Sequence, residues 1–183
     1  MNILLISFLF VLCIQNTAVA HAIIRVKNDY SVDELEQHAL FYADKLGLDS
    51  SVNIIISLKS NVSKGIRGYT QYNNASDIGG GHQVLITINQ DMKRSEQLHT
   101  LAHEMVHAKQ FVEGKLVKEN GSANYSWKGW YYKKIYKIAH HERPWEKEAH
   151  QLGGRLYMAF KQQFPLLAMP RGSDLSADSS YND

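Results

Sequence analysis

Two histidines and a glutamate lie close together in residues 98–111, LHTLAHEMVHAKQF. On an α-helix, residues four apart project from the same face, so His103 and His107 can reach one ion from consecutive turns. Glu104 is rotated by about 100° from His103, too far to bind that ion but close enough to reach a water molecule on it. Zinc lowers the pKa of such a water, and a carboxylate can take its proton. The pattern H-E-x-x-H therefore predicts a catalytic metal site, and the alternative is an ordinary helix with two surface histidines.

A zinc site with two histidines needs a third protein ligand that leaves one coordination position open. Residues 144–150, PWEKEAH, offer candidates on a later helix: Glu146, Glu148 and His150. His99 lies one turn before His103, but three histidines at i, i+4 and i+8 span about 12 Å along a helix and do not share one ion. We therefore expect His99 to be a neighbouring or surface residue.

Periodic apolar segments indicate the elements that position these residues. Leu98, Leu101, Met105 and Val112 recur at helical spacing around the motif. Applied along the chain, the same reasoning predicts helices over 31–48, 93–112 and 144–164, and strands over 51–59, 65–73 and 82–89. Residues 73–82, with three consecutive glycines, and 118–132 are predicted loops. The expected fold class is α+β: a small mixed or antiparallel sheet packed on the H-E-x-x-H helix and on a later ligand-bearing helix.

The first 20 residues have the features of a signal peptide. An apolar run at residues 3–14 is followed by Ala18 and Ala20, an A-x-A cleavage pattern, so we expect cleavage before His21. The alternative is an uncleaved anchor, since the segment begins without Lys or Arg. The chain's one cysteine, Cys13, lies in this segment, which leaves a mature chain without disulfides. The sequence thus predicts an exported protein, periplasmic or secreted, with a domain over 21–168 and a disordered tail over 169–183.

Composition excludes several classes of protein. The chain is 44% hydrophobic and 21% charged, as in an ordinary globular domain. A formal net charge of +2 gives no argument for nucleic-acid binding, and the lysines of residues 131–137 are expected on a solvated helix face. No further apolar run is long enough for a stable membrane span once the signal peptide is removed. The oligomeric state is not indicated.

These motifs resemble those of a known enzyme family. H-E-x-x-H on one helix, with a glutamate from a later helix in a Glu-Ala context, resembles the gluzincin branch of the zincin metallopeptidases. The segments HEMVHAKQ, WKG and PWEKEA are similar to those of compact gluzincin-like domains of bacteria and phages, over about residues 50–160. The resemblance implies His103 and His107 as Zn²⁺ ligands and Glu104 as general base and acid.

The resemblance leaves two candidates for the third ligand, Glu148 and Glu146. In thermolysin-like enzymes the ligand glutamate immediately precedes a small or polar residue, which favours Glu148, followed by alanine, over Glu146. Those enzymes also place an aspartate four residues later to hold a histidine, where this chain has Leu152. Either another group orients the histidines, or the ligand is Glu146. The metzincin pattern does not fit, because Gln110 and Glu113 stand where its glycine and third histidine belong.

The resemblance implies a zinc-dependent metallopeptidase with a peptide or protein substrate. The alternatives are a zinc amidase or cell-wall hydrolase, and a non-catalytic zinc-stabilised binding module, against which the intact Glu104 argues. In zincins the strand beside the active helix pairs with extended substrate, so residues 82–89 are expected to do so here. We expect the oxyanion donor among five side chains before the last helix: His140, His141, Tyr131, Tyr132 and Tyr136.

Overall fold

The computed structural model describes residues 22–27, 32–60, 62–63, 65–74 and 81–165. The predicted signal peptide (1–20) and the predicted disordered tail (169–183) lie outside these residues. Within the described part of the chain, no helix combines the length and the apolar character needed to cross a bilayer.

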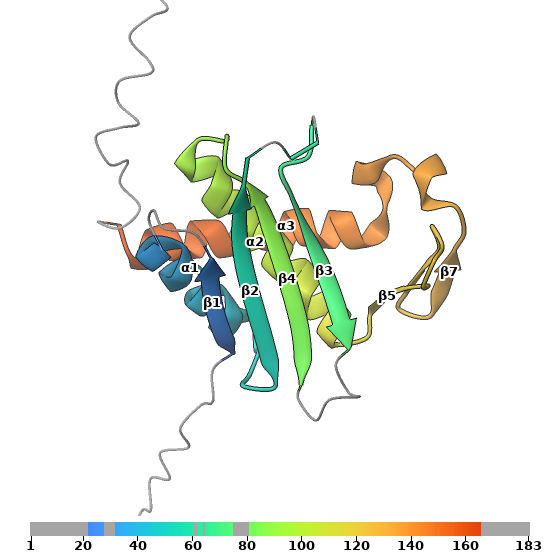
Figure 1. The fold of residues 1–183 in the computed structure, drawn as a ribbon, viewed down its shortest axis with the longest axis horizontal. Helices are drawn as coiled ribbons and strands as arrows, with labels where there is room; N and C mark the ends of the chain where they lie inside the picture. The colour runs from blue at the N-terminus through green and yellow to red at the C-terminus, as the bar shows by residue number, and fades with distance from the viewer. Residues whose placement is uncertain (1–21, 28–31, 61, 64, 75–80, 166–183) are drawn as a thin grey trace, which may run out of the picture.

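A four-stranded mixed sheet forms the centre of the fold (Figure 1). Its spatial order is β1-β2-β4-β3, with parallel pairing between β1 and β2 and between β2 and β4, and antiparallel pairing between β4 and β3. The strands are β1 (Ile23–Lys27), β2 (Val52–Lys59), β3 (Gly68–Asn74) and β4 (His82–Asn89). Parallel neighbours need a crossover connection, and the helix between β1 and β2 supplies one. Strand β1 is an element that the sequence did not predict.

Three helices lie together on one face of this sheet (Figure 1). They are α1 (Val32–Leu46), α2 (Arg94–Val112) and α3 (Pro144–Gln163), close to the predicted bounds. Ile54, Ile56 and Ile86 of the sheet and Leu101 and Met105 of α2 are fully buried between the layers. The predicted α+β class, with a mixed sheet packed on helices, is confirmed.

Between α2 and α3 the chain forms a second, smaller antiparallel sheet of order β5-β6-β7. Its strands are β5 (Leu116–Lys118), β6 (Tyr125–Trp127) and β7 (Trp130–Tyr132). Lys128 and Gly129 join β6 to β7 with φ of 48° and 85°, as a two-residue turn with both φ values positive requires. The prediction of a loop over 118–132 is therefore wrong, because this segment contains a hairpin. Leu116, Trp127 and Trp145 form a small separate core beneath it, the satellite core.

Candidate metal centre

The two histidines of the H-E-x-x-H motif meet on the face of α2 that turns toward α3. Their Nε2 atoms are 3.0 Å apart. The side chain of His107 is buried, at 9% exposure, and that of His103 is 23% exposed. The apolar stripe of α2, including Leu101 and Met105, packs on the sheet and holds the helix so that this pair faces outward from the core.

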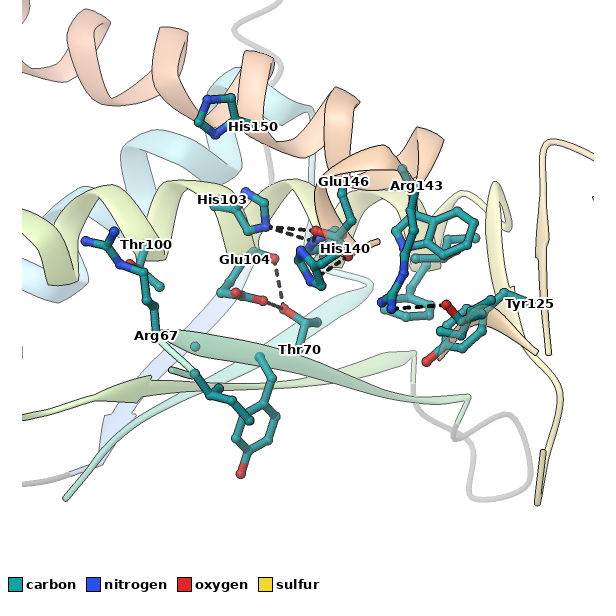
Figure 2. Close-up of a pocket in the computed structure, with 18 of the residues that line it drawn as sticks. Arg67, Thr70, Thr100, His103, Glu104, Tyr125, His140, Arg143, Glu146 and His150 are labelled. Atoms are coloured by element: carbon teal, nitrogen blue, oxygen red, sulfur yellow. Dashed lines mark hydrogen bonds and ion pairs between the residues drawn. The ribbon is translucent and has the colours of Figure 1, made fainter. Parts of the chain in front are cut away.

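The third member of the cluster is Glu146, in the first turn of α3. Its Oε2 atom lies 3.3 Å from Nε2 of His103 and 3.2 Å from Nε2 of His107. One ligand atom from each of these three residues lies within 4.8 Å of the other two. Pro144 begins α3, and the neighbouring Trp145 is buried in the satellite core, so the start of the helix is fixed from its other side. Figure 2 shows the carboxylate of Glu146 directed at the His103 imidazole.

The structure places Glu146, and not the expected Glu148, beside the two histidines. Residues two apart on a helix point about 200° apart around its axis, so only one of the two glutamates can face α2's histidines. Glu148 instead accepts a hydrogen bond from Nε2 of Gln110 at 2.9 Å and pairs with Lys128 at 3.0 Å. These bonds lower the pKa of Glu148 although burial opposes the charged form.

Gln110 orients His107. Its side-chain nitrogen donates to the carbonyl of Trp145 (3.0 Å) and to Glu148 (2.9 Å), so its oxygen is the atom that faces Nδ1 of His107, at 2.8 Å. Nδ1 must therefore carry a proton, so the neutral form of His107, the form that can bind a metal, has its lone pair on Nε2 and directed at the cluster. Gln110 is 1% exposed and takes the orienting role for which the sequence offered no aspartate. Sequence reasoning left the role of this residue open, and the signal available was its position one turn after His107.

The electrostatics of the cluster favour positive charge between the three side chains. Burial opposes ionisation of Glu146, but hydrogen bonds from His103 and His107 outweigh it and hold its pKa well below the usual range. Burial likewise opposes protonation of His107, yet Glu146 and Glu104 raise its pKa. A buried carboxylate that faces two imidazole nitrogens is stabilised by a proton or by a metal cation.

The distances within the cluster fit a small divalent ion. Ligand atoms at about 2.1 Å from a tetrahedral zinc lie about 3.4 Å from one another. The three separations found here are 3.0, 3.2 and 3.3 Å, so each is within a few tenths of an ångström of that value. His103, His107 and Glu146 can therefore hold a metal ion.

Glu104 lies on the side of α2 that faces β3. It is 4% exposed, and burial raises its pKa. The hydroxyl of Thr70 lies 2.7 Å from Oε2 of Glu104 and 3.1 Å from its main-chain oxygen. A Cβ atom at Gly68 would lie 3.2 Å from Oε1 of Glu104 and 2.7 Å from the side chain of Thr100, so glycine is what lets the strand approach the helix this closely. Sequence reasoning singled out neither Thr70 nor Gly68.

The cluster opens into a cavity of about 700 Å³. Figure 2 shows Arg67 and Thr100 on one side of Glu104, and Arg143 and Tyr125 on the other. The wall near Arg143 is apolar and aromatic. This apolar end of the cavity is built by residues of α2, of the small sheet, of the 3₁₀ helix η2 (Ile135–Lys137) and of α3: Phe111, Leu116, Tyr125, Ile135 and Trp145.

The five expected oxyanion donors lie in different places relative to the cavity. Among the described residues that line it, one of the five candidates is present, and that is His140, with Nε2 3.3 Å from Oε1 of Glu146. Tyr131 instead donates to Glu119 at 2.8 Å, and Tyr132 packs on the satellite core. His99 lines the cavity beyond His103, as a neighbour of the cluster and not a member of it.

The strand that borders the cavity is β3. The expectation that β4 pairs with substrate is wrong, because β4 is hydrogen-bonded on one side to β2 and on the other to β3. The N–H of Asn89 donates to the carbonyl of Arg67 at 2.8 Å. Since bonded and non-bonded pairs alternate in an antiparallel ladder, Gly68, Thr70 and Tyr72 direct their main-chain N–H and C=O groups away from β4, toward the open edge.

No protein-family model, curated protein or solved structure matches this chain.

Proposed function

We propose that this protein is a zinc-dependent metallopeptidase. The observation that carries the proposal is the convergence of His103, His107 and Glu146 beside the buried carboxylate of Glu104, at the wall of one cavity. Two imidazoles and one carboxylate are a ligand set suited to catalytic zinc. When bound, the metal would polarise the scissile carbonyl and lower the pKa of a water molecule.

The chain's own residues supply the proton transfer. Glu104 takes a proton from the attacking water and returns it to the leaving amine, and its burial, which raises its pKa, suits a carboxylate that must hold a proton for part of the cycle. Thr70 holds this carboxylate in place from the strand side. His140, which lines the cavity beside Glu146, is the candidate donor to the oxyanion.

The edge of β3 supports a peptide as substrate. Gly68 and Thr70 line the cavity, and together with Tyr72 they direct main-chain donors and acceptors away from β4, toward an edge where an extended peptide can add as a further strand. Thr70 belongs both to this edge and to the contact with Glu104. A peptide bound there would pass next to the proposed base. The signal-peptide pattern of residues 1–20 favours a substrate outside the cytoplasm.

The metal is tested by measuring zinc per chain in purified protein and in two matched variants, Glu146→Gln and Glu148→Gln. These glutamates lie two positions apart on one helix, and both accept hydrogen bonds from α2. We expect one zinc per chain in the unmodified protein and in Glu148→Gln, and its loss in Glu146→Gln. No zinc in the unmodified protein after supplementation would remove the basis of the proposal.

The reaction is tested with Glu104→Gln and a mixed peptide library, with cleavage products read by mass spectrometry. Glutamine keeps the size of the side chain but cannot take a proton, so zinc should be retained while hydrolysis is lost. Cleavage that survives this substitution would refute the assigned role of Glu104. Release of peptide stems from purified peptidoglycan, without cleavage of the library, would favour a cell-wall amidase.

A further inference from the structure

Arg143 is the residue that precedes α3, and it lies at the apolar end of the cavity. Its Nε atom donates to the carbonyl of Ile138 and its Nη2 atom to the carbonyl of Ile135, both at 3.2 Å. These bonds fix the plane of the guanidinium against the turn that links the small sheet to α3. A guanidinium has five N–H groups, so donors remain beyond these two bonds.

The charge of Arg143 is not balanced inside the cavity. Among the described residues no carboxylate lies within ion-pair distance of it, whereas Arg67, at the other end, pairs with Glu96 at 2.7 Å. The described lining contains two carboxylates, Glu104 and Glu146, and the metal cluster and Thr70 already engage both. The apolar end therefore has a fixed positive charge without a negative partner.

The surroundings of Arg143 suit an anion attached to an apolar group. Phe111, Leu116 and Trp145 form walls with little capacity to hydrate a charge, which strengthens a hydrogen bond between a guanidinium and a carboxylate. Strand β3 leads toward this end, because the ring of Tyr72 stacks on that of Phe111 at 5.6 Å. A peptide extended along the edge of β3 would thus bring its side chains or its terminus to these walls.

We infer that the apolar end of the cavity is a subsite for a carboxylate carried next to an apolar side chain, with Arg143 as the residue that binds the carboxylate. The inference rests on the proposed peptidase function for its substrate class. Two sources supply this chemistry in a peptide: a free C-terminus, or an Asp or Glu side chain beside the apolar residue.

The test measures binding and does not require turnover. Isothermal titration of the zinc-loaded protein would use three probes: N-acetylphenylalanine, its amide, and N-acetyl-aspartyl-phenylalanine amide, whose one carboxylate is a side chain. We expect a carboxylate probe to bind roughly tenfold more tightly than the neutral amide. Preference for the first probe would identify a terminal carboxylate as the ligand, and preference for the third an acidic side chain.

Three variants assign the effect to a residue. Arg143→Gln should remove the preference for carboxylate, Arg143→Lys should retain part of it, and Arg67→Gln, at the opposite end, should leave it unchanged. If Arg143→Gln does not fold, the inference is tested by the probe comparison in the unmodified protein and by whether Arg143→Lys weakens the preference for carboxylate.

Equal binding of acid and amide probes, or a preference that survives Arg143→Gln because the metal itself binds the carboxylate, would overturn the inference. Either result would leave the peptidase proposal standing. Peptide cleavage that survives Glu104→Gln would refute the assigned role of Glu104 and leave the probe comparison intact.

Discussion

Gly153 sets how closely α3 approaches α2, and its substitution tests whether that approach brings Glu146 to His103 and His107. A Cβ atom at Gly153 would lie 3.0 Å from both Cα and N of His103, closer than ordinary packing allows. The adjacent Gly154 is a matched control, because the nearest atom to its Cβ would be Nε2 of His99, at 4.0 Å. Both are helical glycines of α3.

The expected magnitudes follow from these contacts. Replacing a glycine inside a helix by alanine stabilises the helix by about 1 kcal/mol, a gain that both variants share. Gly153→Ala must also force two helix backbones apart, and overpacking of this kind costs about 1–3 kcal/mol. The free energy of unfolding should therefore be lower in Gly153→Ala than in Gly154→Ala by roughly 1–3 kcal/mol. For a domain of this size that corresponds to a difference in Tm of about 3–9 °C.

Zinc affinity should also differ between Gly153→Ala and Gly154→Ala. Glu146 lies on the same helix two turns before Gly153, so a displaced α3 lengthens the 3.2 and 3.3 Å separations from the histidines. Zinc tolerates deviations of only about 0.2 Å in its ligand distances, and we expect roughly tenfold weaker binding in Gly153→Ala and none of this loss in Gly154→Ala. Thermal unfolding of the metal-free proteins and competition with a chromophoric chelator would measure the two effects. Equal stability and equal zinc affinity in both variants would refute the reasoning.

Two further substitutions test other contacts. Thr70→Val removes the hydroxyl next to the carboxylate of Glu104 and should lower kcat for peptide hydrolysis by about 10- to 100-fold. Thr70→Ser keeps a hydroxyl at this position and should keep the unmodified rate. Equal rates in the valine and serine variants would contradict the positioning role of Thr70. His38 is 1% exposed, donates from Nδ1 to the carbonyl of Glu34 at 2.8 Å, and its burial lowers its pKa. Its neutral form is thus favoured by folding, so its contribution to stability is complete above about pH 6.5 and falls with pH, by up to about 1.4 kcal/mol between pH 7.5 and 5.5. Denaturant unfolding of the metal-free protein should show a shallower loss over this interval in His38→Leu, and an unchanged pH dependence would contradict the assignment.

The sequence predicted those parts of the fold that depend on local geometry. His103 and His107 are brought together by the pitch of a single helix, and their spacing alone places them on one face. The choice between Glu146 and Glu148 depends on the rotation of α3 against α2, which is set by long-range contacts such as that of Gly153. A pattern within residues 144–150 carries no information about this rotation.

The elements that sequence reasoning missed are short. Strands β5, β6 and β7 have three residues each, too few for an alternating pattern to stand out. Strand β1 has five residues and depends on its parallel neighbour β2. Strand β4 lies inside the sheet because the strand order is β1-β2-β4-β3. This order depends on pairing between distant segments, which the pattern of residues 82–89 does not show.

Trp145 and Glu146 are consecutive residues that belong to two different parts of the molecule. Trp145 is 2% exposed and belongs to the satellite core, whereas Glu146 faces the histidines of α2. Local opening of the small sheet would therefore release the start of α3 and separate His103 and His107 from Glu146, so we expect the two regions to open as one cooperative unit. A bound metal would then slow amide hydrogen exchange in β5, β6 and β7, strands that contribute no ligand, because their opening would first have to expel the ion.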